Sequence, residues 1–583
     1  MSQGPSAARP SFLRSTFVLA SANFATKVIG GLIVIPLYYL LGSEGMGLYN
    51  SAYRIYTILL IISTQGVNIV IARLVAERMA VDDRQGAERV FAVSFWLLSS
   101  LGLVFALLFW WGAPFLVRLF SIDERSYLSM VSLAPAIFLV AVMSVYRGFL
   151  QGLQRMTPFA MSQFIEQVAR VIGLFIILPF VFRLGVQYGA AAATFGAVIG
   201  ATVSLAYLVW KNRSIRAQFG ITPGGDLGSD DLSQSPLGQA NLGGLPGEAG
   251  LPADTTPPTG VWVRLGGPFD RGDRAASWRI LKNIIYLAIP ITFAGVAAQL
   301  IQFLDVALVQ ARLKAGGIEQ VLATQMFGQL SGAAMLLVNL PTMFAGAFFL
   351  ALIPAISEAR QLKRPDIIRH RTVQSLQLTL ALTIPAAVGL LVLPSQIGDT
   401  LFGDAGAGVT ISAAAVATIF LSLQQTTSGI LYGLGRSAIP IYNLIAGGAV
   451  KAGLTWWLTA IPALNVRGAA YATVIGFLVA GGLNWLAVER LVRGSLDWVK
   501  SVVKPLVASA FMAAAAFFGY RLLLAVVHHA KIATLLAVGL AAAVYFIVLI
   551  AVGGLDDEEF GRIPIVGRYV VAVLRPLHIG RGR

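Results

Sequence analysis

The chain has 583 residues, of which 57% are hydrophobic and only 12% are charged, with a formal net charge of +16. Soluble domains carry about 25% charged residues, so a large share of this chain must face lipid, and its basic residues are sorted by loop as in a membrane protein rather than a nucleic-acid-binding one. The absence of cysteine excludes disulfides, thiol catalysis and cysteine metal sites, and the four histidines are scattered, so we expect no metal and no cofactor.

The first predicted element is a short cytoplasmic N-terminus, residues 1–14. The apolar run that follows is long enough to span a bilayer and has no clear small-residue cleavage site, so we expect a retained helix rather than a signal peptide. Windows of about 20 apolar residues predict fourteen spans, which makes the chain an all-α polytopic membrane protein. The predicted spans are 15–41, 48–74, 90–112, 127–150, 159–182, 187–210, 284–310, 324–355, 373–396, 407–432, 440–462, 468–489, 503–526 and 532–554.

These spans divide into two pseudo-symmetric six-helix lobes followed by two further helices. We expect an N-lobe at 15–210, a C-lobe at 284–489 and the last two helices within 490–554. Residues 211–283 lie between the lobes. Their Gly/Pro-rich centre, 220–260, has too few apolar residues to fold alone, which is typical of a flexible linker.

Lys and Arg concentrate in the loops and tails on one side of the predicted spans. Because basic loops stay on the cytoplasmic side, the linker is expected there, and an even number of spans places both termini there too. The basic tail, residues 555–583, is expected to lie on anionic lipid of the inner leaflet.

The sequence repeats itself at a constant shift, the one that carries Gly148 onto Gly429. The stretch YRGFLQGLQRMTPFAMSQFIEQVARVIG at 146–173 returns in outline as SGILYGLGRSAIPIYNLIAGGAVKAG at 428–453. The same shift carries Arg170 onto Lys451. A six-span unit returns the chain to its starting side, so the two copies are expected to be parallel.

Four basic residues lie well inside predicted spans: Lys27, Arg54, Arg170 and Lys451. An Arg or Lys at the bilayer centre costs at least ~2.5–3.5 kcal/mol on insertion scales, so such residues usually face a cavity or a partner. Their excess over the acidic residues in the spans favours an anionic cargo, because Lys binds phosphate as a point charge and Arg as a planar fork. We therefore predict that these four residues bind the cargo.

The predicted fifth span carries polar residues at i, i+3, i+4 and i+7, which lie on one helical face and indicate the wall of a cavity. Alternatively, Glu166 and Arg170, four residues apart, neutralise each other and lock helices together. The residues predicted to line the cavity or to couple transport are Asn23, Gln163, Glu166, Gln167 and Asp305.

Several blocks of this sequence resemble one transporter family. They include TKVIGGLIVIPLYYLLGSEGMGLYNSAYRIY at 26–56, YRGFLQGLQRMTPFAMSQFIEQVARV at 146–171 and NLPTMFAGAFFLALIPAISEA at 339–359. The chain resembles the multidrug/oligosaccharidyl-lipid/polysaccharide exporter superfamily, and within it the polysaccharide branch that contains SpoVB, YtgP and the MurJ lipid II flippases. The resemblance covers nearly the whole chain apart from the linker and tails.

This resemblance implies two six-helix lobes around a central cavity, plus two extra helices, that move lipid-linked sugars by alternating access. In the MurJ family, basic residues of the first helices contact the cargo diphosphate, and Lys27 and Arg54 occupy comparable spans here. MurJ proteins carry an Arg-Asp pair in the first span, whereas this chain has Thr26 and Lys27. That departure leaves open whether the cargo is lipid II or another polyprenyl-diphosphate oligosaccharide.

The sequence thus predicts a flippase of the bacterial inner membrane, with lipid II as the first candidate for its cargo. Its partners would be an anionic lipid-linked saccharide, membrane lipids and a coupling ion or the membrane potential. It is not expected to be an enzyme, because it contains no P-loop, HExxH or nucleophile-elbow motif. The alternatives are a MATE-type drug or cation exporter, which would favour acidic cavity residues, and a non-transporting scaffold for envelope assembly.

Overall fold

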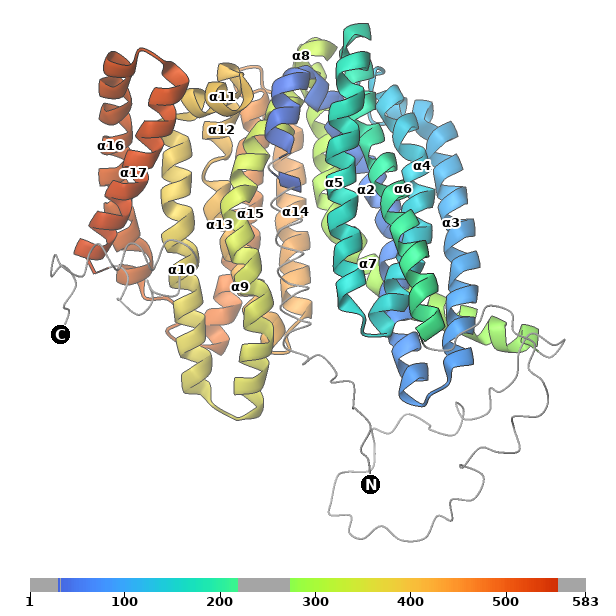
Figure 1. Ribbon diagram of the computed structural model, residues 1–583. Coiled ribbons are helices and arrows are strands. Elements are labelled where there is room, and N and C mark those ends of the chain that lie inside the picture. Colours follow the sequence, from blue (N-terminus) through green and yellow to red (C-terminus); the bar gives the residue numbers. More distant parts are fainter. Residues whose placement is uncertain (1–29, 32, 219–272, 554–583) are drawn as a thin grey trace.

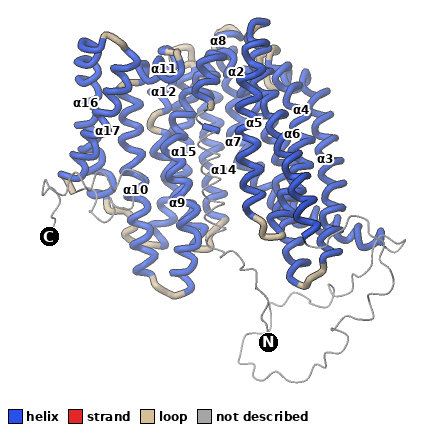
Figure 2. The backbone as a smooth tube through the Cα atoms, in the orientation of Figure 1, coloured by secondary structure: helices blue, strands red, loops and turns tan. Residues whose placement is uncertain are grey.

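The computed structural model describes residues 30–31, 33–218 and 273–553, and within these ranges the chain is helical with no strand (Figures 1 and 2). Lys27, Asn23, most of the first predicted span, the Gly/Pro-rich linker and the basic tail lie outside the described residues. The predicted class, an all-α membrane protein of many spans, is confirmed. In the view of Figure 1, the end of the bundle that carries α8 and α11 is called the upper end, and the opposite end the lower end.

The first half of the described chain, called the N-lobe, contains five helices on one side of the bundle (Figure 1). Within α2 the helix is broken at Gly42, whose φ of +66° and ψ of 179° are not helical and which follows the predicted end of the first span. The helices are α2 (Val34–Ala80), α3 (Arg84–Leu119), α4 (Ser126–Gly152), α5 (Met156–Val181) and α6 (Val186–Gln218), with the 3-10 turn η1 (Phe182–Leu184).

The second half contains the C-lobe, from α7 to α15, and the final helices α16 and α17, which pack at the outer side of the C-lobe (Figure 1). Its second predicted span is divided by a π-helical turn, η4, between α8 and α9. The elements are α7 (Asp273–Ala315), α8 (Gln320–Gly328), η4 (Gln329–Ala334), α9 (Met335–Gln361), α10 (Pro365–Val392), α11 (Pro394–Phe402), η5 (Ala405–Ala407), α12 (Gly408–Ala414), α13 (Ala417–Gly433), α14 (Ala438–Leu458), α15 (Val466–Leu491), η6 (Val499–Val503), α16 (Lys504–Val527) and α17 (Ala530–Ala551).

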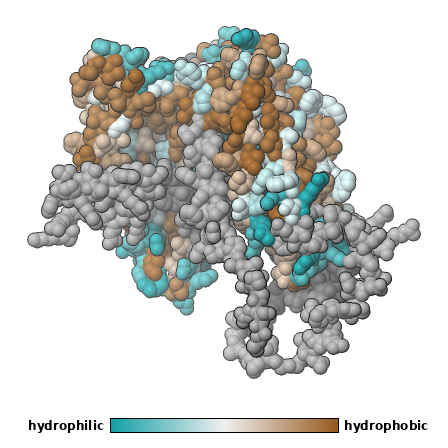
Figure 3. All heavy atoms as spheres, viewed as in Figure 1, coloured by the Kyte–Doolittle hydropathy of each residue, from teal (hydrophilic) through white to brown (hydrophobic). Residues whose placement is uncertain are grey.

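Among the described residues, ten helices are long and apolar enough to cross a membrane, or eleven if the bent pair Ala405–Ala414 and Ala417–Gly433 is one span. The predicted number of fourteen spans therefore stays a prediction. Large apolar side chains such as Trp96, Phe180 and Leu522 are exposed on the helices, as expected where the solvent is lipid. Figure 3 shows hydrophobic residues over the middle of the visible face and hydrophilic residues gathered at the lower loops.

The internal repeat is visible as repeated helix packing. In each lobe one pair of helices packs so closely that only glycine fits at two positions one turn apart. A Cβ added at either position would lie less than 3 Å from the neighbouring helix. The packing of α4 on α2 in the N-lobe thus corresponds to that of α13 on α9 in the C-lobe. The repeated contacts are Gly148–Asn68 and Gly152–Val75 in the N-lobe, and Gly429–Phe349 and Gly433–Ile356 in the C-lobe, each pair related by the shift seen in the sequence.

Helix α7 contacts both lobes. Its lower half places Ile284 and Ala288 in the apolar core of the N-lobe, where the backbone of α7 approaches Gly66 of α2 so closely that an added Cβ would lie 2.4 Å from the Ala288 carbonyl oxygen. Its upper half is fastened to α14, because Nε of Arg312 donates to the Trp456 carbonyl oxygen at 2.8 Å. α7 therefore carries side chains into the space between the lobes.

Candidate cargo-binding site

A cavity of about 420 Å³ lies where α2, α5 and α7 meet. Two of the four predicted cargo-binding cations, Arg54 of α2 and Arg170 of α5, line it together with the predicted Gln167. None of the described lining residues is a carboxylate. The other polar residues that line the cavity are Tyr49, Asn50, Tyr53, Thr57, Gln299 and Gln302.

Arg54 reaches across the cavity to α7. Its Nη1 donates a hydrogen bond to Oε1 of Gln302, so the guanidinium is held by a neutral acceptor rather than by an acid. Such a contact leaves the guanidinium without a hydrogen-bonded carboxylate, because an amide oxygen carries only a dipole. The arginine can therefore still attract an anion.

Arg170 packs on the ring of Tyr53, one of two stacked tyrosines of α2. Its guanidinium carbon is 5.0 Å from the ring centroid of Tyr53, and its Nη1 donates to the Tyr53 hydroxyl at 3.2 Å. The Tyr53 ring stacks in turn on Tyr49, with centroids 5.5 Å apart and planes at 9°. Arg170 Nη2 and Asn50 Nδ2 are buried without a hydrogen-bond partner among the described residues, and buried donors in this condition are uncommon.

Lys451, the third predicted cation, lies apart from this cavity in the C-lobe. Its Nζ is 2.8 Å from Oδ2 of Asp305 on α7, and the two side chains are 6% and 17% exposed. Asp305, which the sequence predicted to line the cavity or to couple transport, is the counter-ion of Lys451 in this structure. A buried cation paired in this way is not available to a ligand unless the pair opens.

Glu166 and Gln163, predicted as cavity residues, are not among the residues that line this cavity. The carboxylate of Glu166 is 2.8 Å from Nη2 of Arg147 on α4, and among the described residues it forms no ion pair with Arg170. The alternative of a Glu166–Arg170 pair is therefore wrong in this structure. Oε1 of Gln163 is buried without a described partner.

Sequence reasoning missed the residues of α2 and α7 that surround the two arginines. Their spacing carried a signal, because Asn50, Arg54 and Thr57 follow i, i+4 and i+7 and so share one helical face. Gln299 and Gln302, three residues apart, likewise share a face of α7. A polar face on a predicted membrane helix would have identified them, even though amides are uncharged.

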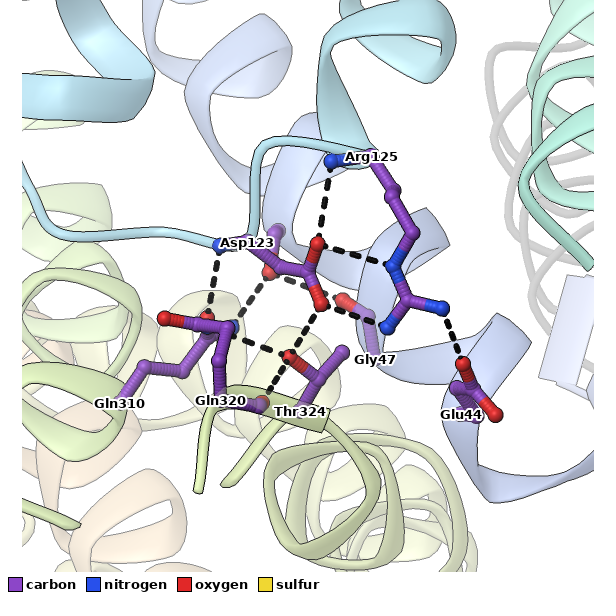
Figure 4. A network of polar contacts seen from close by, with 8 residues as sticks. Glu44, Gly47, Asp123, Arg125, Gln310, Gln320 and Thr324 are labelled. Carbon is purple, nitrogen blue, oxygen red and sulfur yellow. Dashed lines mark hydrogen bonds and ion pairs between the residues drawn. The ribbon is translucent and has the colours of Figure 1, made fainter. Parts of the chain in front are cut away.

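A second polar cluster joins the lobes at the upper end (Figure 4). The loop between α3 and α4 places Asp123 against α7 and α8: its N–H donates to Gln310 Oε1 at 3.3 Å, and its Oδ2 accepts from Thr324 Oγ1 at 2.9 Å. Arg125 holds Asp123 by Nη2 to Oδ2 at 2.7 Å and also contacts Glu44 of α2. Burial favours the neutral form of Asp123, but the hydrogen bonds from Arg125 and Thr324 outweigh it and lower the pKa of this carboxyl, so it stays ionised.

The backbones of α2 and α8 touch beside this cluster. A Cβ at Gly47 would lie 2.1 Å from the Thr324 carbonyl oxygen, and a Cβ at Gly328 would lie 1.8 Å from the Ser43 carbonyl oxygen. No side chain fits at either position, so the lobes are in direct contact at the upper end. Arg54 follows Gly47 by seven residues, which places the cavity about 10 Å below this contact at 1.5 Å per residue.

Comparison with known proteins finds a different family model on each half of the chain. Residues 12–222 match a family described as "Polysaccharide biosynthesis protein", and residues 275–546 match a family described as "Lipid II flippase MurJ". The two matches fall on the N-lobe and on the C-lobe with the final helices.

Curated relatives align over most of their length. Stage V sporulation protein B of Bacillus subtilis (strain 168) is 26% identical over 571 residues, which cover 97% of this chain and 100% of that protein. Lipid II flippase MurJ of the same strain is 27% identical over 524 residues, covering 86% of this chain and 87% of that one.

Solved transporter structures share the fold. The structure described as "Lipid II flippase MurJ, inward closed conformation" matches with a TM-score of 0.63 and 14% identity over 91% of this chain and 98% of that chain. A multidrug resistance MATE family transporter of the MOP superfamily in an inward-facing conformation matches with a TM-score of 0.60 and 15% identity, over 81% of this chain and 95% of that chain. At such identity the likeness concerns the arrangement of helices only.

Proposed function

Because the chain belongs to the polysaccharide and lipid-flippase branch of the multidrug/oligosaccharidyl-lipid/polysaccharide (MOP) exporter superfamily, we propose that its cavity carries the anionic head of a polyprenyl-diphosphate-linked saccharide across the membrane. The observation that carries this proposal is the set of donors around the cavity. Arg54 and Arg170 both line it, Arg170 Nη2 and Asn50 Nδ2 have no described acceptor, and no described lining residue is acidic.

The chemistry of the lining suits the two parts of such a head group. Arginine forks bind phosphate oxygens in bidentate fashion, which favours a diphosphate at Arg54 and Arg170. Amide side chains and tyrosine hydroxyls, here from Gln167, Gln302 and Tyr49, can donate and accept, as sugar hydroxyls require. Lys27, which lies outside the described residues, remains a proposed third basic contact, from the first predicted span.

We propose lipid II as the first cargo to test, since one matched family and one relative are described as lipid II flippases. The direction would be from the inner to the outer leaflet of the bacterial inner membrane, with both termini cytoplasmic and the lobes rocking about the cavity. Energy would come from a coupling ion, the membrane potential or cargo supply. The predicted lobes, linker and tail remain part of this proposal.

The alternatives differ in what the cavity must bind. An exporter of cationic drugs would need carboxylates facing its cargo, and the described lining has none. A non-transporting scaffold would have no reason to keep two arginines in the membrane, because each is costly there. Neither alternative is favoured by a particular contact.

The test is binding of a fluorescent polyprenyl-diphosphate saccharide to purified protein in lipid nanodiscs. Hydrogen bonds to charged groups contribute about 1.5–3 kcal/mol, so Arg54→Gln and Arg170→Gln should each weaken binding about 10- to 100-fold. The matched control is Arg73→Gln, since Arg73 is exposed and pairs with Glu77 outside the cavity. Unchanged affinity in both cavity variants, with the protein folded, would refute an anionic cargo.

A further inference from the structure

Two cations that the internal repeat relates to each other are in opposite states. Lys451 of α14 is paired with Asp305, whereas Arg170 of α5 keeps one guanidinium nitrogen without a described acceptor. The difference is unexpected from the local sequence. Arg170 has an acid one helical turn before it, Glu166, at the spacing at which carboxylates and arginines attract each other.

Glu166 is instead occupied by a residue of another helix. Nη2 of Arg147, on α4, lies 2.8 Å from Oε2 of Glu166. Arg147 is itself fixed by two hydroxyls, because its Nε donates to Ser162 Oγ at 2.9 Å and its Nη2 to Ser204 Oγ at 3.4 Å. Its side chain is only 12% exposed, so the ion pair is held by α4, α5 and α6 together.

The C-lobe shows that this charge is not needed to hold such helices together. The shift of the internal repeat carries Arg147 onto Ser428 and Glu166 onto Gly447, neither of which is charged. At this place the C-lobe has a neutral network, in which Asn443 Nδ2 donates to Asn484 Oδ1 at 2.9 Å and Asn484 Nδ2 donates to Ser428 Oγ at 3.0 Å. The charged pair of the N-lobe therefore calls for a reason beyond packing.

We propose that Arg147 is a positioning residue that keeps Arg170 available to the cargo. Arg147 forms an ion pair with Glu166, and this pair prevents the Glu166 side chain from reaching Arg170, which lies one helical turn further along α5. A carboxylate with little solvent around it takes the cation within reach, because an unpaired charge there is costly. This inference rests on the proposed function and adds to it the residue that sets the charge of the cavity.

The experiment compares four proteins in the nanodisc assay: wild type, Arg147→Gln, Glu166→Gln and the double variant. Arg147→Gln should weaken binding of the fluorescent polyprenyl-diphosphate probe at least about tenfold, since Glu166 then captures Arg170. The double variant should bind within about threefold of wild type, because the capturing carboxylate is gone. Glu166→Gln alone should bind like wild type.

Controls separate positioning from folding. Arg78→Gln removes an arginine that forms a half-buried ion pair with Asp83 away from the cavity, and it should leave the affinity unchanged. Arg147→Lys keeps the positive charge and should bind within about threefold of wild type. Arg147→Ser, which copies Ser428, replaces Arg147→Gln if the latter does not fold.

The outcomes distinguish this inference from the proposed function. If wild type itself does not bind the probe, the anionic cargo is refuted. If wild type binds and folded Arg147→Gln binds equally well, only the positioning role is refuted. A third outcome would also refute the inference. If neither Arg147→Gln nor Arg147→Ser gives folded protein, and adding Glu166→Gln restores folding, then Arg147 has a structural role only.

Discussion

At the scale of single residues, buried charge in this protein is either compensated or left with free hydrogen-bonding capacity. Lys451 and Asp305 compensate each other across α14 and α7. Arg170, in contrast, is held by a tyrosine hydroxyl and a ring face, which leave its charge uncompensated. A buried ion pair stabilises the fold because neither partner is left as an unpaired charge. A buried cation without a counter-ion can instead bind an anionic ligand.

Lys451→Met is expected to destabilise the protein rather than to weaken cargo binding selectively. Removing one partner of a buried ion pair costs about 3–5 kcal/mol, because Asp305 is then left unpaired at 17% exposure. Adding Asp305→Asn should restore most of the loss. Thermal unfolding in detergent measures both effects, with exposed Lys314→Met as the control. A normal melting temperature together with lost probe binding would instead assign Lys451 to the cargo.

The sequence located Arg54 and Arg170 because arginine in a membrane span is costly and therefore informative. It did not identify Arg147, which lies near the lower end of α4, where an arginine can extend to the interface and needs no explanation. The alternative that paired Glu166 with Arg170 named the wrong partner, since the i, i+4 rule considers one helix only. Partners from other helices, such as Arg147 for Glu166 and Asp305 for Lys451, required the packed structure.

At the scale of elements, α2 and α8 bring the two lobes into backbone contact at Gly47 and Gly328. The spans predicted at 48–74 and 324–355 both contain Gly, Gln and Asn, and the second also contains Pro. The described chain has a π-helical turn, Gln329–Ala334, within the second of these. Hydropathy predicted where the helices lie but not where they end. Helix α3, for example, continues beyond the apolar stretch at both ends.

Gly328→Val should act as a wedge at the upper end. Even its Cβ would lie 1.8 Å from a backbone oxygen of α2, so the two helices must separate. Ser51, fully buried in the upper cluster, then becomes accessible. Because the chain has no native cysteine, Ser51→Cys combined with Gly328→Val should react with a maleimide several-fold faster than Ser51→Cys alone.

The matched control for this wedge is Gly539→Val on α17, where an added Cβ meets no atom within 4 Å. Ser51→Cys combined with Gly539→Val should be labelled as fast as Ser51→Cys alone. If Ser51→Cys reacts equally fast with and without Gly328→Val in folded protein, then α2 and α8 adjust to the larger side chain without separating. The upper contact between the lobes would then not open in this variant.

At the scale of the whole molecule, the repeat makes the chain two parallel copies of one packing scheme joined by α7. The turns after α4 and α13 even share backbone geometry, since Gln154 and Gly435, which the repeat relates to each other, both have a left-handed φ, +57° and +70°. Fold class and repeat could be read from the sequence, because both depend on apolar periodicity and glycine spacing. The lining of the cavity could be predicted only in part, because it combines side chains of several helices that lie far apart in the chain.

Single cysteines at Gln154 and Ser437 should both be labelled only by reagents that reach the cytoplasm. The turns that carry them are equivalent in the repeat, and the basic loops of the chain are expected on that side. Lys314→Cys, at the upper end of α7, should be labelled by an impermeant maleimide from outside the cell. Outside labelling of Gln154→Cys would reverse the proposed orientation.

The difference between Arg170 and Lys451 also has an evolutionary side. When one gene segment becomes two, selection needs only one copy to keep an inherited task, and the other is free to acquire a new one. The position that the repeat shares holds a cation in both halves: Lys451 forms an ion pair with Asp305, whereas Arg170 lies beside a cavity with one guanidinium nitrogen lacking a described acceptor. The repeated helix packing is what the two halves have in common, and the different partners of Arg170 and Lys451 are where the two halves have diverged.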